Sequence, residues 1–189
     1  MVADAKRGDV PHIASVYADG MLGDSASGLR ADALTINPLM GGDVVDAFEE
    51  AAGSCGAGLF ALVRTSNPGA RDLLDRDAGG RPLYEHVAEL VASRAERLAG
   101  ESGLSGMGAV VGATEPGPLA RLRELMPSQV FLMPGVGAQG GAVSDLGPAL
   151  GSHPASVLIA ASRSIANADD PGAAAESLRA EAWGLFARR

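Results

Sequence analysis

The sequence predicts an α/β fold built on a parallel sheet, and three observations carry this prediction. Short runs rich in Val, Ile, Leu and Phe alternate with segments of helical character along the chain of 189 residues. The runs are almost continuously apolar, which is typical of parallel strands that are covered on both faces. The 26 glycines and 11 prolines cluster between the runs, where loops are expected. This alternation fits either a barrel or a doubly wound sheet.

The expected strands are the short apolar runs, and the expected helices are the longer segments between them. Several helices open with proline, which the first helical turn tolerates because its N–H groups have no partner within the helix. The strands are expected at Met1–Ala5, Ala33–Ile36, Gly58–Val63, Met107–Val111, Val130–Met133 and Val157–Ala160. The helices are expected at Pro11–Met21, Asp43–Ala52, Pro82–Leu98, Pro116–Leu125 and Pro171–Phe186.

The composition excludes several classes of partner. Acidic residues outnumber basic residues 23 to 15, for a net charge of −8, so the basic surface that binds nucleic acid or anionic membranes is not expected. The longest apolar stretches fall far short of the roughly 20 residues that span a bilayer. Charges at positions 4, 6, 7 and 9 stand where a signal peptide is apolar, so we expect a cytoplasmic protein. One cysteine and three histidines without metal-ligand spacing predict neither an internal disulfide nor a structural metal.

The only lysine of the chain, Lys6, lies in the string Asp4-Ala5-Lys6-Arg7-Gly8-Asp9. On an extended strand, Asp4 and Lys6 point to the same face, and Asp9 falls in the following loop. At the carboxyl end of a barrel strand, that face is the active site. The neighbouring carboxylates would keep Lys6 as an ammonium that can donate a proton to a developing carbanion, and Asp4 would repel an anionic substrate. Solvated charges at an exposed strand end explain the same string.

Two later loops carry residues suited to an anion. The segment from Pro134 to Gly141 holds four glycines, which let the backbone come close to a ligand and expose N–H groups, and Gln139 adds an amide. The last strand runs into a turn where Arg163 can contact a phosphate at the start of a short helix. In barrels, the loops after the last two strands form a common phosphate site. An ordinary glycine-rich turn is the alternative.

Polar residues also follow three other strands. The loop from Arg64 to Ala70 offers hydroxyls and an amide for recognising a polar ring, although a simple turn at Asn-Pro-Gly explains it equally well. We interpret the strand ends at Thr35 and at Thr114 as turns. Cys55 is expected to be a packing residue, because no histidine lies near it in the sequence.

Six motifs together resemble those of the orotidine 5'-phosphate decarboxylase family, in its longer bacterial branch. These motifs are DAKRGD, TINPLMG, LVRTSNPGARDL, VVGAT, FLMPGVGAQGG and ASRSI, and their order and spacing cover nearly the whole chain. Each motif alone is unspecific, but their joint occurrence is highly specific. The resemblance implies a TIM (β/α)8 barrel. Residues 1–189 would form a single partial domain with about six of the eight βα units, because the chain is roughly 60 residues shorter than a typical barrel.

The resemblance also implies an activity and a set of site residues. The activity is the loss of CO2 from orotidine 5'-phosphate to give UMP, the last step of pyrimidine nucleotide synthesis, by a homodimer without cofactor or metal. Asp4 would stress the substrate carboxylate, Lys6 would protonate C6 of the pyrimidine, and Asp9 would reach across the dimer into the partner's site. The substrate-binding residues would be Ser66 and Thr65 at the pyrimidine, and Gln139, Gly140 and Arg163 at the phosphate.

The sequence departs from the family at two points. Members carry two further strands upstream, with an aspartate for the ribose and a second lysine for the charge network, and they usually have a threonine where Ile13 stands. Either the natural chain begins further upstream or these strands are missing, and we expect residues 1–189 alone to turn over poorly. Two alternatives are a Mg²⁺-dependent sugar-phosphate lyase of the same superfamily and a non-catalytic remnant that binds nucleotide phosphate.

Overall fold

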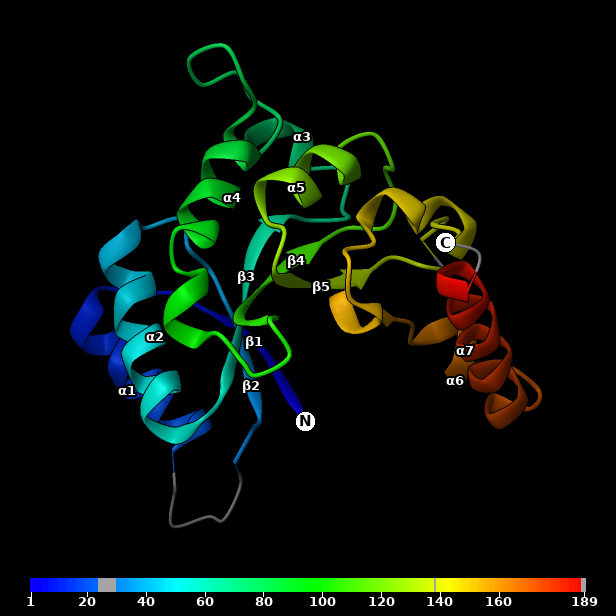
Figure 1. Cartoon of the computed structure of the whole chain (residues 1–189), viewed down its shortest axis with the longest axis horizontal. Coiled ribbons are helices and arrows are strands. Elements are labelled where there is room, and N and C mark those ends of the chain that lie inside the picture. The colour runs from blue at the N-terminus through cyan, green and yellow to red at the C-terminus, as the bar shows by residue number, and fades with distance from the viewer. Residues whose placement is uncertain (24–29, 138, 188–189) are drawn as a thin grey trace.

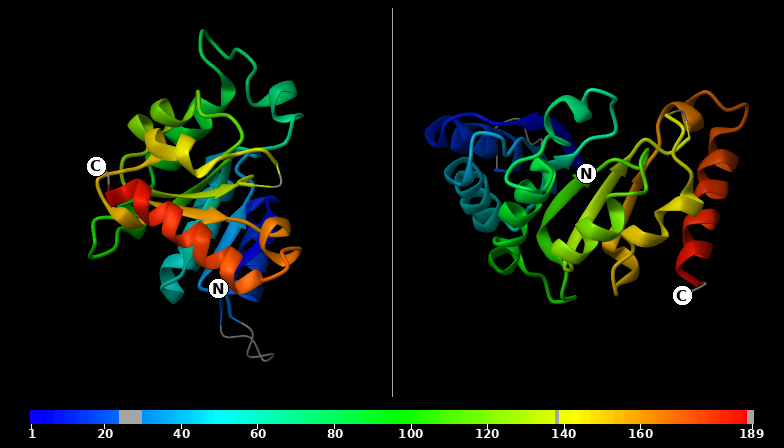
Figure 2. Two further views of the ribbon diagram at one scale, coloured as in Figure 1. Left: turned by 90° about the vertical axis from the view of Figure 1, so that its right-hand side faces the viewer. Right: turned by 90° about the horizontal axis from the view of Figure 1, so that it is seen from above.

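The computed structural model describes residues 1–23, 30–137 and 139–187. Its centre is a single sheet of six parallel strands whose order in space follows their order in the sequence. The sheet curves into half of a barrel (Figures 1 and 2). The predicted α/β fold with a parallel sheet is therefore confirmed. The strands are β1 (Val2–Arg7), β2 (Ala33–Ile36), β3 (Gly58–Arg64), β4 (Ser105–Val111), β5 (Gln129–Pro134) and β6 (Val157–Ala160).

Helices cover the outer side of the curved sheet. Helices α1, α2, α4 and α5 lie along one side, and α7 packs beside the last strand (Figure 1). The helices are α1 (Pro11–Leu22), α2 (Gly42–Cys55), α3 (Ala70–Leu73), α4 (Leu83–Ala92), α5 (Leu119–Leu125), α6 (Arg163–Ala166) and α7 (Pro171–Ala187). Short 3₁₀ helices are η1 (Ala95–Leu98), η2 (Val143–Ala149) and η3 (Pro154–Ser156).

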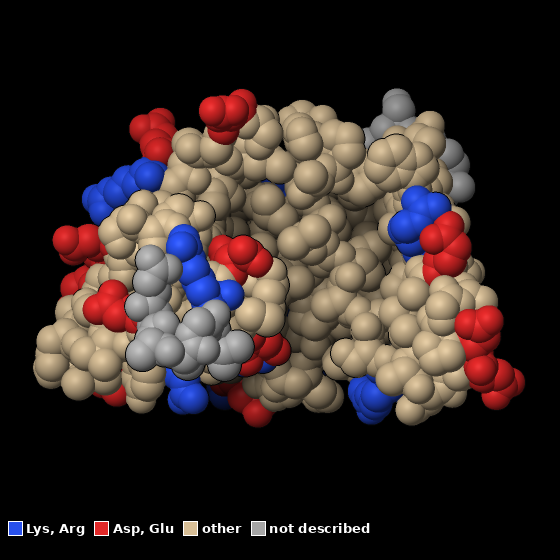
Figure 3. All heavy atoms as spheres, turned by 90° about the horizontal axis from the view of Figure 1, so that it is seen from below, with Lys and Arg blue, Asp and Glu red and all other residues tan. Residues whose placement is uncertain are grey.

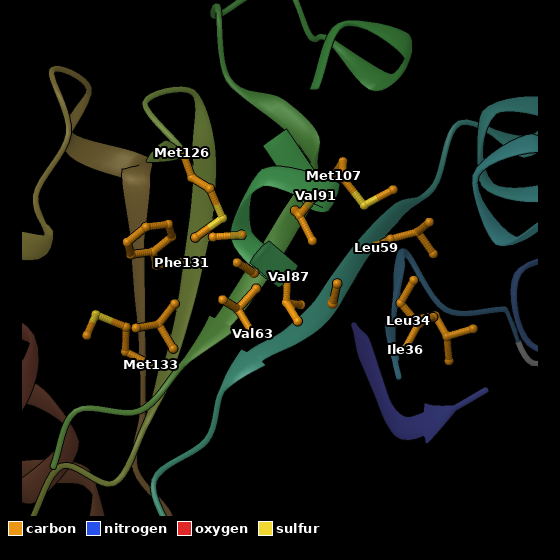
Figure 4. Packing of buried hydrophobic residues seen from close by; sticks show 14 of the residues in the cluster. Leu34, Ile36, Leu59, Val63, Val87, Val91, Met107, Met126, Phe131 and Met133 are labelled. Atoms are coloured by element: carbon orange, nitrogen blue, oxygen red, sulfur yellow. The ribbon is translucent and has the colours of Figure 1, made fainter. Parts of the chain in front are cut away.

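The two faces of the sheet carry different apolar clusters, because successive side chains of a strand point to opposite faces. The outer cluster is the main core, in which residues such as Leu34, Met107 and Phe131 pack against the helices (Figure 4). The inner cluster is small and centres on Phe60 and Val110. Seen as in Figure 3, the molecule is hollowed across its middle, and few charged residues line the hollow. The helices thus hold the sheet from outside.

Three sequence predictions need correction. The strands β1 and β6 are largely accessible rather than buried, because they stand at the two ends of the described sheet. The helix expected at Pro82–Leu98 is split between α4 and η1, since the side chains of Ser93 and Arg94 bond to the carbonyl of Leu90 where α4 ends. The helix expected from Pro116 begins only at Leu119. The short elements α3, η2 and η3 were not expected.

Two negative findings concern the described part of the chain only. No described helix is both long and apolar enough to cross a membrane. No group of three or more His, Cys, Asp or Glu residues among those described is arranged to hold a metal ion. Cys55 ends α2 and packs against the main core, as expected for a packing residue.

Candidate active site

The residues singled out in the sequence lie at one edge of the sheet. The strands are parallel, so their carboxyl ends and the loops that follow them share this edge. In barrels, this edge carries the active site. The predicted residues are Asp4 and Lys6 on β1, Asp9 after β1, Thr65 and Ser66 after β3, Gln139 and Gly140 after β5, and Arg163 after β6.

Asp4 and Lys6 form an ion pair at the end of β1. The Lys6 Nζ lies 2.6 Å from Asp4 Oδ2, and both side chains are about half exposed. The hydrogen bond from Lys6 is the main reason why the pKa of the Asp4 carboxyl lies below its ordinary value. A hydrogen bond from Thr35 lowers this pKa further, while partial burial acts in the opposite direction. The charged form of Asp4 is therefore favoured beside the Lys6 Nζ.

Asp9 lies in the short connection between β1 and α1. Its Oδ1 accepts a hydrogen bond from the Val10 N–H at 2.8 Å. The preceding Gly8 packs closely on the loop after β2, because a Cβ added there would lie 2.7 Å from the Asn37 carbonyl oxygen. Ile13 stands in the first turn of α1. The loop that carries Asp9 is thus fixed against its neighbour.

Ser66 and Gln139 meet although 73 positions separate them in the sequence. The Ser66 hydroxyl donates to Gln139 Oε1 at 2.9 Å, which joins the loop after β3 to the loop after β5. The Thr65 hydroxyl donates instead to Asn67 Oδ1 at 2.7 Å. Thr65 lines a mostly apolar pocket with residues such as Leu39 and does not share the cleft of Ser66. The structure therefore brings Ser66, and not Thr65, to Gln139.

A cleft of about 650 Å³ opens beside this contact. Its lining comes from the segments that follow β3, β4 and β5, and six of its seven residues carry hydroxyl, amide or charged groups. The residues are Ser66, Asn67, Pro68, Arg71, Thr114, Glu115 and Gln139. Three segments that are distant in sequence thus build one open cleft.

A buried arginine ties two of these loops together. The Arg64 side chain is only 3% exposed, and it donates to both carboxylate oxygens of Asp75 and to Glu115 Oε2 at 2.9 Å. Glu115 also pairs with Arg71, and this contact raises the pKa of the Arg71 guanidinium. The Thr114 hydroxyl donates to the Ser66 carbonyl at 3.1 Å. The ion pairs of Arg64 and Arg71 with Glu115 therefore hold the segment that carries Ser66 against the segment after β4.

The glycine-rich loop after β5 is closed by its own hydrogen bonds. The Gly140 N–H donates to the Gly137 carbonyl at 2.8 Å, and the Gly141 N–H donates to the Gly135 carbonyl at 3.1 Å. These two amides therefore point into the loop in this structure. Gly137 has a φ of +76° and lies so close to α6 that an added Cβ would come 3.0 Å from the Ser164 hydroxyl. Arg163, which is exposed, begins α6 as expected.

Sequence reasoning missed Thr35, Arg64 and Thr114 as members of the site. The sequence predicts that both threonines belong to turns, but their hydroxyls contact Asp4 and the Ser66 backbone. It predicts Arg64 at the start of a loop, although Arg64 is the buried last residue of β3. The only feature of the sequence that could have indicated these residues is their position. Each lies near or just beyond the carboxyl end of an apolar strand.

The family of this chain follows from comparison with known proteins. The model of the Orotidine 5'-phosphate decarboxylase / HUMPS family matches residues 1–178. The chain belongs to this family. The resemblance seen in the six sequence motifs is thereby confirmed.

Curated relatives agree with this assignment. The chain is 40% identical over 168 residues to an orotidine 5'-phosphate decarboxylase of Rhodopirellula baltica, covering 87% of this chain and 56% of the relative. It is 41% identical over 184 residues to one of Deinococcus radiodurans, covering 94% of this chain and 63% of the relative. The chain thus spans less than two thirds of the length of these relatives.

Solved structures show the same fold. The structure of Leishmania donovani UMP synthase matches with a TM-score of 0.80 and 40% identity, over 97% of this chain and 39% of that chain. The structure of Leishmania donovani OMP decarboxylase matches with a TM-score of 0.78 and 38% identity, over 97% of this chain and 67% of that chain. The half-barrel described above is similar to a part of each.

Proposed function

We propose that this protein decarboxylates orotidine 5'-phosphate to UMP, without metal or cofactor. The observation that carries the proposal is the Asp4–Lys6 ion pair of 2.6 Å at the same sheet edge as the Ser66–Gln139 contact. An ammonium held beside a carboxylate is suited to deliver a proton to a carbanion. Membership of the family supports the same reaction.

In the proposed reaction, Asp4 acts before the carbon–carbon bond breaks and Lys6 acts after it. Asp4 stands beside the substrate carboxylate and destabilises it by like-charge repulsion. The bond between C6 and the carboxyl carbon breaks, CO2 leaves, and the electron pair stays on C6. Lys6 then transfers a proton to C6, which gives UMP, and the neutral amine regains a proton from water. The ammonium also stabilises the negative charge that develops on C6.

The remaining site residues bind parts of the substrate that do not react. Ser66 contacts the pyrimidine, and Gln139 and Arg163 hold the 5'-phosphate. Because Gln139 Oε1 accepts from Ser66, the amide nitrogen of Gln139 is the group that donates to the phosphate. Gly140, at a φ of +92°, allows the backbone to pass close to the phosphate. Binding energy from the phosphate offsets the strain at the reacting carboxylate.

The proposed assembly is a homodimer of barrels in the cytoplasm. Residues 1–189 form a single domain, which is part of an eight-stranded barrel in which two further βα units join the sheet. Asp9 then reaches the site of the partner subunit. Ile13 in α1 replaces a threonine, so a hydrogen bond across the dimer is lost. The net charge of −8 supports the exclusion of nucleic acid and anionic membranes as partners.

The test uses the protein purified from its own cells, with its intact mass recorded. Formation of UMP and CO2 from orotidine 5'-phosphate is measured with and without EDTA. We expect equal amounts of both products at a rate that EDTA leaves unchanged. A polypeptide of residues 1–189 alone is expected to turn over poorly, and robust turnover by it would contradict the need for two further strands.

Two other outcomes would replace the proposal. Activity on a pentulose or hexulose phosphate alone, abolished by EDTA, would assign the protein to the Mg²⁺-dependent lyases of the superfamily. Weak binding of UMP without any decarboxylation would identify a non-catalytic nucleotide-binding protein.

Replacing Gly112 with alanine should weaken UMP binding about tenfold, roughly the worth of one hydrogen bond. Gly112 follows β4, and an added Cβ would lie 2.7 Å from the backbone N and Cα of Ser66. The Ser66 backbone must therefore shift, which disturbs its contact with Gln139. Calorimetric titration with UMP measures the effect.

Gly117→Ala is the matched control for this prediction. Gly117 lies in the same loop, and an added Cβ there meets nothing within 4 Å among the described residues. Its dissociation constant for UMP should equal that of the wild type. A folded Gly112→Ala variant with unchanged affinity would show that the position of Ser66 does not govern binding.

A further inference from the structure

The ladder between β1 and β2 is interrupted at the Asp4–Lys6 pair. Ala3 pairs with Leu34 and Arg7 pairs with Ile36, so three residues of β1 lie opposite a single residue of β2. The three include Asp4 and Lys6, and the single residue is Thr35. A bulge of this kind disrupts the ladder of backbone hydrogen bonds and changes the direction of side chains on the bulged strand.

The side chain of Thr35 bridges this interruption. Thr35 is fully buried, and its Oγ1 accepts from the Lys6 N–H at 2.9 Å and donates to Asp4 Oδ1 at 3.0 Å. A backbone N–H can only donate, and the hydroxyl has one proton, so the direction of both bonds is fixed. The Ala3 carbonyl, at 3.5 Å, is a more distant acceptor. One hydroxyl therefore joins the Lys6 backbone to the Asp4 carboxylate.

The backbone of Lys6 adopts a conformation that needs such support. Its φ is +49°, and no other non-glycine residue in the described ranges has a positive φ. This region is unfavourable for any residue with a Cβ, and residues that adopt it concentrate at functional sites. Asp4 is held at both oxygens, by Thr35 at Oδ1 and by Lys6 at Oδ2. The side chain of Thr35 therefore contacts the bulge, a member of the ion pair and the residue with the unusual φ.

We propose that Thr35 is a positioning residue for the decarboxylation, whose hydroxyl fixes the bulge of β1 and thereby aims Asp4 and Lys6 at the reacting atoms. This inference rests on the proposed function, because Asp4 and Lys6 are its reacting pair. Groups held in place before the reaction need no reorganisation when charge develops, so their alignment governs the rate. Thr35 itself does not contact the substrate in this proposal.

Three variants separate the hydroxyl from the shape of the side chain, each made in the protein as its cells produce it. Thr35→Val keeps the branched shape and removes the hydroxyl, whereas Thr35→Ser keeps the hydroxyl and removes a methyl group. Ser105→Ala is the matched control. Ser105, at the other end of the sheet, has a hydroxyl that accepts from the Met107 N–H at 3.0 Å and donates to the Ala95 carbonyl at 2.7 Å.

The first readout is the NMR pH titration of the Asp4 carboxyl, which needs no substrate. Within the described contacts, Lys6 is the charged group that faces Asp4, and Thr35 contributes an uncharged donor from β2. Loss of this donor in Thr35→Val is expected to raise the pKa of Asp4 toward its ordinary value. Thr35→Ser and Ser105→Ala should keep the wild-type titration.

The second readout is steady-state decarboxylation. Thr35→Val should lower kcat about tenfold with little change in KM, since the lost hydrogen bond acts at the reacting groups and not at the phosphate. Thr35→Ser should restore kcat. Ser105→Ala should change neither constant, although its thermal stability should fall.

The role of Thr35 and the decarboxylase function can fail independently in these experiments. An unchanged Asp4 titration together with an unchanged kcat in Thr35→Val would overturn it, as would equal losses in Thr35→Val and Thr35→Ser. If the protein does not decarboxylate orotidine 5'-phosphate, the proposed function fails. The NMR titration then still shows whether the Thr35 hydroxyl holds Asp4.

Discussion

Replacing Lys6 with methionine should lower kcat for decarboxylation by about 10²- to 10⁴-fold, the range that a positioned general acid contributes. Methionine fills a similar volume but has no proton to give to C6 and no charge to stabilise the carbanion. The dissociation constant for UMP should stay near the wild-type value, because the proposed phosphate contacts come from Gln139 and Arg163. The measurement is steady-state UMP formation together with calorimetric titration.

Arg7→Met is the matched control for the lysine variant. It removes an equal charge from the next residue of β1, whose guanidinium lies 5.1 Å from the centre of the Tyr17 ring. Its kcat should remain close to that of the wild type. Wild-type turnover by Lys6→Met would refute the proposed proton donor.

Replacing Arg123 with methionine should lower the free energy of unfolding by about 3 to 5 kcal/mol, because each buried acceptor that loses its donor costs about 1–3 kcal/mol. The guanidinium donates to the carbonyls of Ala149 and Ser156 at 2.8 and 3.1 Å, and its carbon lies 3.7 Å from the centre of the Phe131 ring. It also bonds to the carbonyls of Met126 and Gln129. Urea denaturation measures the loss.

Arg121→Met provides the comparison on the same helix. Arg121 is about half exposed and pairs with Glu85 and Glu124. The exposed pair with Glu124 contributes little, and the pair with Glu85, whose side chain is 12% exposed, contributes more, so this variant should lose about 1 to 2 kcal/mol. Equal midpoints of denaturation for both arginine variants would show that the backbone contacts of Arg123 do not stabilise the fold.

The strands and the ion pair could be predicted because they depend on local pattern. A buried parallel strand is a continuous apolar run, and residues two apart on a strand share a face, which placed Asp4 beside Lys6. The carboxyl edge of a parallel sheet also gathers the loops that follow the strands, so the loops of Ser66, Gln139 and Arg163 could be assigned to one end. These features can be predicted from residues close together in the sequence, without knowledge of tertiary contacts.

The supporting residues could not be predicted, because their partners are set by register and tertiary contact. Arg64 bonds to Asp75 and Glu115, which stand 11 and 51 positions away. Thr35 contacts both Asp4 and Lys6 only because a bulge places three residues of β1 opposite it. The orientation of Thr65 away from Ser66 likewise depends on a local contact with Asn67 that spacing does not encode.

The strand order that follows the chain has a consequence for folding. Every described strand pairs only with strands adjacent to it in sequence, so each addition to the sheet closes a loop of one βα step. The entropy cost of closing such a loop grows slowly with its length, and proteins with contacts between neighbouring segments fold faster than those that pair distant strands. The sheet can therefore grow outward from a buried interior pair such as β3 with β4. Growth in this order places the Ser66 loop before the loop of Gln139 and that of Arg163.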